Sequence, residues 1–116
     1  MPKTRNSDNR LGYTRPMESY NKLVRDKIPE MLDGKGIPYE KRIASSEEYK
    51  DELIKKLAEE VGEFAEAGAP EELADVLEVI EALRKLPEYE NVETLRVQKR
   101  NERGGFDEGI ILKGEK

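Results

Sequence analysis

Two amphipathic helical patterns, separated only by Gly68-Ala69-Pro70, occupy the middle of the chain from Ser45 to Leu86. In each pattern, apolar residues recur at the three- and four-residue spacing of one helix face. Gly68 suits the left-handed position that ends a helix, and Pro70 suits the first turn of a new one. So short a connection predicts that the two helices pack side by side as an antiparallel hairpin.

Local signals also predict where the helices begin and end. Ser45 and Glu48 have the spacing of a capping box, in which each side chain accepts a hydrogen bond from the other residue's backbone N–H. The first helix should run to about Ala67. The second should end near Leu86, because Pro87 cannot continue it. A third helix is expected from about Asn91 to Gly104-Gly105.

The remaining segments predict smaller elements. Residues 20–34 predict a turn followed by a short helix from Pro29 to Asp33. Residues 37–43 alternate in polarity and 109–113 form a similar apolar run, so we predict a ribbon of about 38–43 with 109–113. The predicted fold is all-α, a helical hairpin with additional helices and this ribbon. Residues 1–19 are predicted to be a flexible tail, and 20–116 a single domain.

The chain contains neither histidine nor cysteine, which removes several classes of chemistry. Disulfides, thiolate nucleophiles, zinc–sulfur sites, imidazole ligands and Ser-His-Asp arrangements all need one of these residues. Catalysis would therefore use Asp, Glu, Lys, Arg, Tyr or a metal ion. Side-chain oxygens suit hard cations such as Mg²⁺, Mn²⁺ or Ca²⁺.

Charge and hydropathy restrict the partners. The net charge of −5 disfavours duplex nucleic acid, so we expect no stable nucleic-acid complex. No apolar run has the length of a membrane span or the position of a signal-peptide core, so we expect a cytoplasmic protein without a membrane partner. Only 35% of the residues are hydrophobic, so the core is small and oligomerisation is expected.

Two acidic motifs lie on the predicted hairpin, Glu60-Val-Gly-Glu63 on the first helix and Glu72-Leu-Ala-Asp75 on the second. With about 100° of rotation per residue, Glu60 and Glu63 lie at one edge of the apolar arc of the first helix. On the second helix, Glu72 lies inside the apolar arc and Asp75 lies at its margin. The two acidic edges should therefore meet across an antiparallel pair.

Neighbouring acids point elsewhere, since Glu59 and Glu66 are turned further toward solvent. Four carboxylates brought close resist ionisation unless a cation neutralises them. Mg²⁺ would do so and would keep positions open for water and phosphates. The alternative is a solvated helix face, because Glu-x-x-Glu and Glu-x-x-Asp arise easily in a chain with 26 acidic residues.

The acidic pair in its setting, EEVGEFAEA followed by EELADVLEVI, resembles the MazG-like all-α nucleoside triphosphate pyrophosphohydrolases. The opening YNKLVRDKIPEML and the closing KRNERGGFDEGIIL resemble a small single-domain subgroup described as house-cleaning enzymes for non-standard nucleotides. Together these segments cover about residues 20–112. One departure is that only eight residues separate Glu63 from Glu72, fewer than in many relatives. A shorter loop implies a small nucleotide pocket, or one that another subunit completes.

The resemblance implies hydrolysis of a nucleoside triphosphate to the monophosphate and pyrophosphate, with Mg²⁺ as cofactor and Mn²⁺ as a substitute. It assigns the metal ligands to Glu60, Glu63, Glu72 and Asp75. Glu59 matches an acid that would assist the attacking water, so the catalytic residues implied are Glu60, Glu63 and Glu59. The resemblance also implies a homo-oligomer, a dimer or larger.

Phosphate oxygens that the metal leaves uncovered need Lys or Arg. The candidates for substrate binding are Lys22 and Arg25 in the opening segment, Lys56 one turn before Glu60, and Arg103 before two glycines. The alternative is that they are solvated charges or ion-pair partners of the many carboxylates.

Four further residues have less specific predictions. Tyr39 and Phe106 could stack on a base, although core packing is favoured for both, and Leu95 and Val97 are predicted to be core residues of the third helix. Two other functions stay open for the chain as a whole. One is a non-catalytic nucleotide- or metal-binding regulatory module, and the other is a helical interaction module whose acidic edge meets a basic partner.

Overall fold

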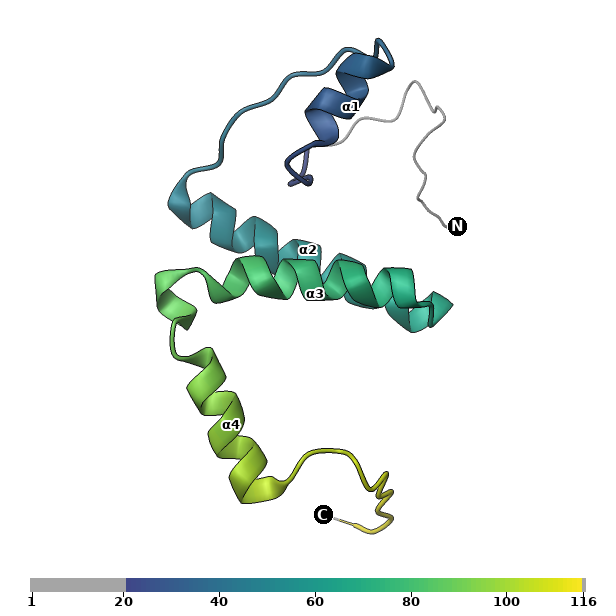
Figure 1. The fold of residues 1–116 in the computed structure, drawn as a ribbon, viewed down its shortest axis with the longest axis vertical. Coiled ribbons are helices and arrows are strands. Elements are labelled where there is room, and N and C mark those ends of the chain that lie inside the picture. Colours follow the sequence, from purple (N-terminus) through teal and green to yellow (C-terminus); the bar gives the residue numbers. More distant parts are fainter. Residues whose placement is uncertain (1–20, 116) are drawn as a thin grey trace. The chain divides into compact units, whose positions relative to one another are not determined.

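The computed structural model describes residues 21–115, and this part of the protein contains four α-helices and no β-strand (Figure 1). The elements are α1 (Ile28–Gly34), α2 (Ser46–Ala67), α3 (Pro70–Arg84), the 3₁₀ turn η1 (Pro87–Tyr89) and α4 (Val92–Arg103). The predicted all-α class is confirmed for these residues. The predicted tail, residues 1–19, lies outside the described part of the chain.

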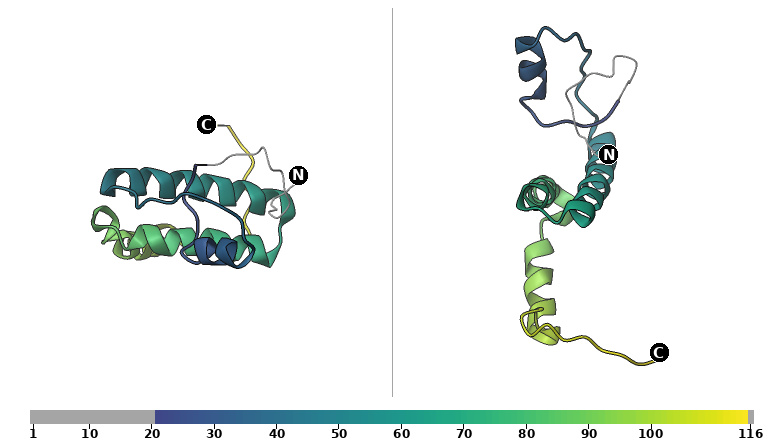
Figure 2. Two further views of the ribbon diagram at one scale, coloured as in Figure 1. Left: turned by 90° about the horizontal axis from the view of Figure 1, so that it is seen from above. Right: turned by 90° about the vertical axis from the view of Figure 1, so that its right-hand side faces the viewer.

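Helices α2 and α3 form the predicted antiparallel hairpin and lie side by side in every view (Figures 1 and 2). Ser45 caps α2, because its Oγ accepts a hydrogen bond from the backbone N–H of Glu48 at 3.3 Å. Gly68 ends α2 at φ 63°, and its N–H donates to the carbonyl oxygen of Phe64 at 2.7 Å. Pro70 begins α3. The predicted end of α2 at Gly68 and the predicted start of α3 at Pro70 are therefore both confirmed.

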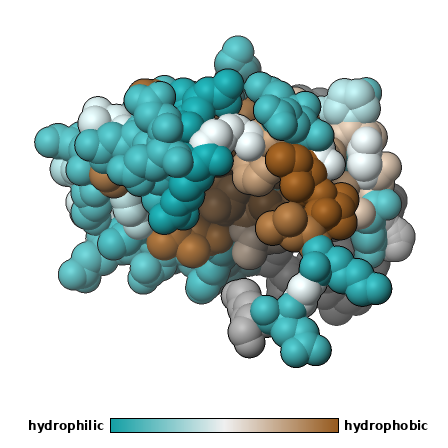
Figure 3. Space-filling view, turned by 90° about the horizontal axis from the view of Figure 1, so that it is seen from below, coloured by the Kyte–Doolittle hydropathy of each residue, from teal (hydrophilic) through white to brown (hydrophobic). Residues whose placement is uncertain are grey.

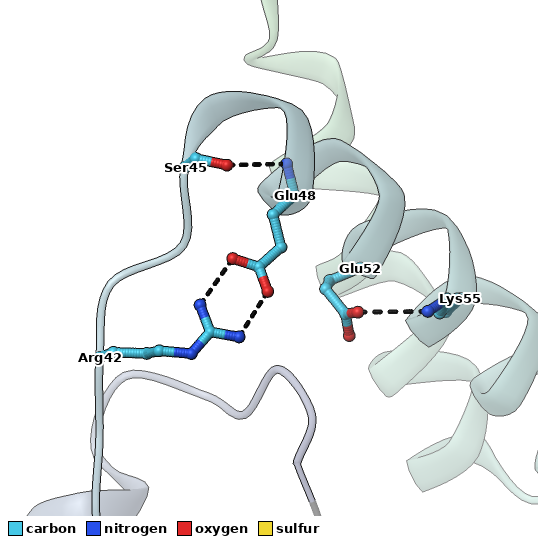
Figure 4. A network of polar contacts seen from close by, with 5 residues as sticks. All are labelled: Arg42, Ser45, Glu48, Glu52 and Lys55. Atoms are coloured by element: carbon cyan, nitrogen blue, oxygen red, sulfur yellow. Dashed lines mark hydrogen bonds and ion pairs between the residues drawn. The ribbon is translucent and has the colours of Figure 1, made fainter.

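Only half of the predicted capping box forms. The Glu48 carboxylate does not return to the Ser45 backbone but accepts two bonds from Arg42, at 2.7 and 2.5 Å (Figure 4). A guanidinium offers two charge-assisted hydrogen bonds, which one backbone N–H cannot match. Arg42 therefore ties the segment before α2 to the first turn of that helix.

Helix α3 ends at Arg84 rather than at Leu86, and the 3₁₀ turn η1 follows. Helix α4 begins after Asn91, the predicted N-cap position, although the Asn91 side chain makes no capping hydrogen bond. Helix α1 is the short helix predicted before Gly34, with a proline in its first turn. Within residues 21–115, no helix has both the length and the apolar character needed to cross a bilayer.

The predicted ribbon of 38–43 with 109–113 is wrong, because neither segment has strand structure. Ile43 and Ile111 are each 91% exposed, so neither segment buries an apolar face. A two-stranded ribbon is marginal in water without a packed face to stabilise it. Alternating polarity alone was therefore not enough to predict a strand.

The buried core of the described residues is small. Its apolar members are Leu53, Val76 and Val79. One neighbouring helix covers only one flank of the wide apolar arc on α2 and on α3. Four other apolar residues of these arcs are 42–53% exposed: Ile54, Val61, Leu73 and Leu77. Figure 3 shows apolar side chains gathered on the surface among hydrophilic ones.

The described residues belong to two compact units that divide between Leu83 and Arg84. The first unit contains α1, α2 and most of α3, and the second contains η1, α4 and the C-terminal segment. In the second unit, Glu93 binds both Arg84 and Arg96, at 3.3 and 2.6 Å. Ion pairs on exposed surfaces, more than buried apolar residues, connect the parts of this unit.

The core positions predicted in the second unit are wrong. Leu95 and Val97 are 46% and 39% exposed, and Phe106 is 98% exposed. A single helix of 12 residues has no neighbour within its unit that could cover an apolar face. Tyr39, in the first unit, is partly buried, and its hydroxyl donates to Asp33 Oδ1 at 2.8 Å. This hydrogen bond raises the pKa of Tyr39.

Candidate metal centre

Glu60 is the buried charged residue of the described structure, and its side chain is only 9% exposed. Its Oε2 lies 3.3 Å from Nζ of Lys56, one turn earlier on α2. Its Oε1 is buried and has no hydrogen-bond partner. An unsatisfied buried acceptor costs about 1–3 kcal/mol. Glu60 therefore has one oxygen that lacks a donor or a cation.

The hairpin brings other acids within electrostatic reach of Glu60. Burial raises the pKa of the Glu60 carboxyl, Lys56 lowers it, and the charges of Glu63 and Asp75 raise it, with a net upward shift. Glu63 follows on α2 and Asp75 comes from α3, so the charges of two other predicted metal ligands act on Glu60. Glu72 is partly buried in the first turn of α3 and is not among the charges that shift Glu60.

Glu60 is more deeply placed than its sequence pattern predicts. It was expected at the edge of the apolar arc, yet it is 7% exposed whereas Val61 and Ile54 are 46% and 45% exposed. Helix α2 therefore turns the side that carries Leu53 and Glu60 toward its neighbours. The sequence pattern could not show this rotation, because it depends on which part of the arc α3 covers.

Glu59 lies beside Glu60 and binds two lysines. Its Oε2 is 3.0 Å from Lys22 Nζ, and its Oε1 is 3.2 Å from Lys56 Nζ. Burial raises the pKa of Glu59, but the bonds and charges of Lys22 and Lys56 outweigh burial and lower its pKa overall. Glu59 is therefore held in its ionised form at the margin of the site.

Arg25, in the segment before α1, pairs with Asp75 of α3. Its Nη2 donates to Asp75 Oδ1 at 2.7 Å, and the two side chains are 55% and 40% exposed. Lys22, Arg25 and Lys56, which were candidates for phosphate binding, thus all contact predicted site carboxylates. The alternative of ion pairing is what the described structure shows for these three residues.

Arg103 lies in the second unit, exposed in the last turn of α4. Gly104 after it has φ 84°, a conformation that favours glycine. A Cβ atom at Gly105 would come within 2.5 Å of Arg100 Nη1. Because that nitrogen ends a flexible side chain that can move aside, only Gly104 has a local structural reason to be glycine. Arg103 also suits a helix C-terminus, where a positive charge is favourable, and its role in substrate binding stays a prediction.

A pocket of about 240 Å³ lies next to Glu59. One wall comes from the segment before α1 and the other from α2. Its lining residues are Asn21, Lys22, Leu23, Glu52, Lys55, Lys56 and Glu59. Ligand sites for whole drug-sized molecules are usually about 300–1,000 Å³, so this pocket has the size for part of a nucleotide.

Sequence reasoning did not identify Asn21, Glu52 or Lys55 as pocket residues. Lys55 binds Glu52 at 3.3 Å (Figure 4), and both are on the side of α2 that faces this pocket. The adjacent pair Lys55-Lys56 was the available signal. It was not sufficient, because neighbouring residues on a helix point about 100° apart and spacing alone does not tell which of them meets another segment.

The donor chemistry of the site suits a hard cation. In the arrangement described for residues 21–115, no three acidic side chains are gathered as a metal-binding group. Lys56 and Arg25 instead supply positive charge to Glu60 and Asp75. Oε1 of Glu60 is buried and has no hydrogen-bond partner, so it is the oxygen of this site that lacks a donor.

Comparison of the chain with protein-family models, curated proteins and solved structures finds no match. Function is therefore inferred from the residues of the hairpin and their contacts.

Proposed function

We propose that the protein is a Mg²⁺-dependent nucleoside triphosphate pyrophosphohydrolase of the MazG-like type, which clears non-standard nucleotides in the cytoplasm. The observation that most supports this proposal is the Glu60 carboxylate, buried with an unpartnered Oε1 and with Glu63 and Asp75 nearby. Buried like charges without full compensation are costly and are typical of functional sites. The family resemblance of the three sequence segments supports the choice of reaction.

Each predicted residue has a role in this reaction. The residues that would hold the ion are Glu60, Glu63, Glu72 and Asp75. When bound, Mg²⁺ would neutralise phosphate charge and favour ionisation of the attacking water. In this proposal, Glu59 orients that water and accepts its proton; its lowered pKa supports this role, because the carboxylate is ionised.

The bonds that change are those at the α-phosphorus. Water oxygen bonds to this atom, and the bond from the α-phosphorus to the oxygen that bridges to the β-phosphorus breaks. Pyrophosphate leaves with the bridging oxygen, and the proton of the water passes to Glu59. Lys22, Arg25 and Lys56 are the residues of the first unit proposed to bind phosphate oxygens, which the chemistry needs for positioning and charge stabilisation.

Pyrophosphate release from a panel of standard and damaged nucleotides tests the proposal. The wild type should release pyrophosphate, and not orthophosphate, only when Mg²⁺ or Mn²⁺ is present. Asp75→Asn should reduce the rate about 100-fold or more, since even indirect changes to a metal site cost about 10–100-fold. Glu71→Gln, which changes an exposed acid one turn earlier on the same helix, is the matched control and should keep its activity. Turnover without metal would contradict the proposal.

The alternative functions are a regulatory module and a helical interaction module. Exposed apolar residues on α2 and α3, such as Val61 and Leu77, favour an interaction role. A regulatory module would bind nucleotide with metal and release no pyrophosphate. An interaction module that uses its acidic edge would bind a basic partner with an affinity that falls steeply with salt.

The same proposal includes a homo-oligomer, a dimer or larger. The buried apolar core of residues 21–115 consists of Leu53, Val76 and Val79, and domains with small cores often need oligomerisation for stability. A second copy of the α2–α3 hairpin would cover the exposed apolar residues and complete a four-helix bundle.

A further inference from the structure

We propose that residues 21–27 form a cationic strap whose Lys22 and Arg25 occupy the site carboxylates until metal binding releases them to bind the phosphate chain. This inference rests on the proposed function and adds a coupling between its two ligands. Lys22 and Arg25 cannot bind the carboxylates and the phosphates at the same time. Metal binding to the carboxylates and phosphate binding to the two cations would therefore favour each other.

The strap is connected to both helices of the hairpin by ion pairs between residues far apart in sequence. Lys22 binds Glu59 of α2 at 3.0 Å across 37 residues, and Arg25 binds Asp75 of α3 at 2.7 Å across 50 residues. Asp75 also raises the pKa of Glu60, so this ion pair lies within electrostatic reach of the buried acid. Two anchors three residues apart hold the strap beside the carboxylates.

Both anchors are weak enough to be replaced. The Lys22–Glu59 side chains are 46% and 36% exposed, and those of Arg25–Asp75 are 55% and 40% exposed. Exposed ion pairs contribute little, whereas a bound divalent ion is the largest local charge in a site and reverses its electrostatics. Once Mg²⁺ neutralises the carboxylates, Lys22 and Arg25 lose the attraction that holds them.

The neighbouring pocket shows where the released cations would act. The 240 Å³ pocket has strap residues Asn21 to Leu23 on one side and Lys55 and Lys56 of α2 on the other. Its size suits a phosphate chain rather than a whole nucleotide. A polyphosphate bound here would meet Lys22 from the strap and two lysines from the helix, next to the metal ligands.

Reciprocity follows from this arrangement. If metal frees the cations that phosphate needs, phosphate must increase the affinity for metal by the same factor. In the metal-free protein, the strap cations would also compensate the acids that otherwise repel one another. The strap would thus stabilise the cluster of carboxylates in the metal-free protein and bind phosphate once metal is present.

Calorimetric titration of the full chain tests the first half of the proposal. Arg25→Ala should bind Mg²⁺ alone about two- to fivefold more tightly than the wild type, because its competitor is gone. The same variant should bind preformed Mg²⁺–tripolyphosphate about fivefold or more weakly, because it has lost a phosphate ligand. Opposite changes for the two ligands are the distinguishing result.

Lys27→Ala is the matched control. It removes the same charge from the same segment, and Lys27 has no ion pair among the contacts of the described residues. It should leave both affinities close to those of the wild type. Equal changes in the two affinities for Arg25→Ala and Lys27→Ala would show that only the net charge of the segment matters, and would overturn the strap proposal. Lys22→Ala should behave like Arg25→Ala and serves as a second variant.

Limited trypsin digestion tests the release directly, because trypsin cleaves after Lys22 and Arg25. Saturating Mg²⁺ should accelerate cleavage at these two bonds, while cleavage after Arg42 provides an internal control. Unchanged cleavage with metal bound would also overturn the strap.

If no variant binds Mg²⁺, the proposed function itself fails. If Mg²⁺ binds and pyrophosphate is released but Arg25→Ala matches Lys27→Ala, only the strap fails.

Discussion

Nη2 of Arg25 donates to Oδ1 of Asp75 at 2.7 Å, although 50 residues separate them in sequence. Arg25, which is predicted to bind phosphate, therefore forms an ion pair with Asp75, which is predicted to bind metal. Lys22 and Lys56 make the equivalent contact with Glu59. Three of the four predicted phosphate-binding residues thus pair with predicted site carboxylates in the first unit, where opposite charges compensate one another.

Replacing Glu60 by Gln should stabilise the metal-free protein by about 1 kcal/mol, because it removes a buried charge and retains the size of the side chain. Lys56 would keep Glu59 as a partner at 3.2 Å. Such a change raises the melting temperature by about 4–8 °C in a domain of this size. The stabilisation by Mg²⁺ should disappear in the same variant.

Thermal melts with and without Mg²⁺ check this prediction. Glu66→Gln removes an exposed acid from the same helix and should change neither melting temperature nor metal response. A Glu60→Gln protein that is less stable without metal, or that keeps the full metal shift, would contradict the assignment of Glu60.

Two glycines of the hairpin should respond to alanine in opposite directions. Gly68 has φ 63°, so Gly68→Ala places a Cβ in a left-handed conformation and should destabilise the protein by about 1–2 kcal/mol. Gly62 lies inside α2 and a Cβ there meets nothing within 4 Å, so Gly62→Ala should stabilise it by about 0.5–1 kcal/mol. Urea unfolding of both variants measures the difference, and changes of the same sign would refute the predicted role of Gly68.

Acidification should remove the contribution of the Arg42–Glu48 pair. The hydrogen bonds from Arg42 lower the pKa of Glu48 below its ordinary value. A carboxyl with a lowered folded-state pKa adds stability above its unfolded pKa, near about 4.3, and loses it as pH falls through the folded value. The stability difference between wild type and Arg42→Ala should therefore be constant above about pH 5 and shrink below about pH 4.

Urea unfolding between neutral and acidic pH measures that difference. Lys41→Ala removes the neighbouring charge, for which no ion pair is found within residues 21–115, and should show no comparable dependence. A difference that grows on acidification would contradict the pairing.

Sedimentation should show a dimer or larger species for the wild type. Leu77 is 53% exposed on α3, and Leu77→Glu places a charge on the apolar face proposed to meet a second copy. The variant should dissociate and lose stability together, because a buried unpaired charge at an interface is strongly unfavourable. Glu78→Gln, on the exposed neighbouring position, should leave the assembly intact. A monomeric and equally stable wild type would refute the oligomer.

The helices and their connection could be predicted because their signals act over a few residues. The cap at Ser45, the left-handed turn at Gly68 and the start at Pro70 depend on hydrogen bonds and dihedral angles within one turn. The ribbon failed for the opposite reason, since strand pairing needs a distant partner and a packed face. The residue types in the sequence were enough to select candidate ligands, but they could not predict which residues these ligands contact.

The all-α class of the described residues, the hairpin, and the set of acids and bases available for chemistry follow from local sequence signals. The burial of Glu60 with a free Oε1, the exposure of Val61 and the contact of Arg25 with Asp75 follow from tertiary packing. Helical spacing states which residues share a face, whereas burial and ion pairing depend on which other segment covers that face. That choice is made by contacts between residues tens of positions apart, which no local pattern encodes.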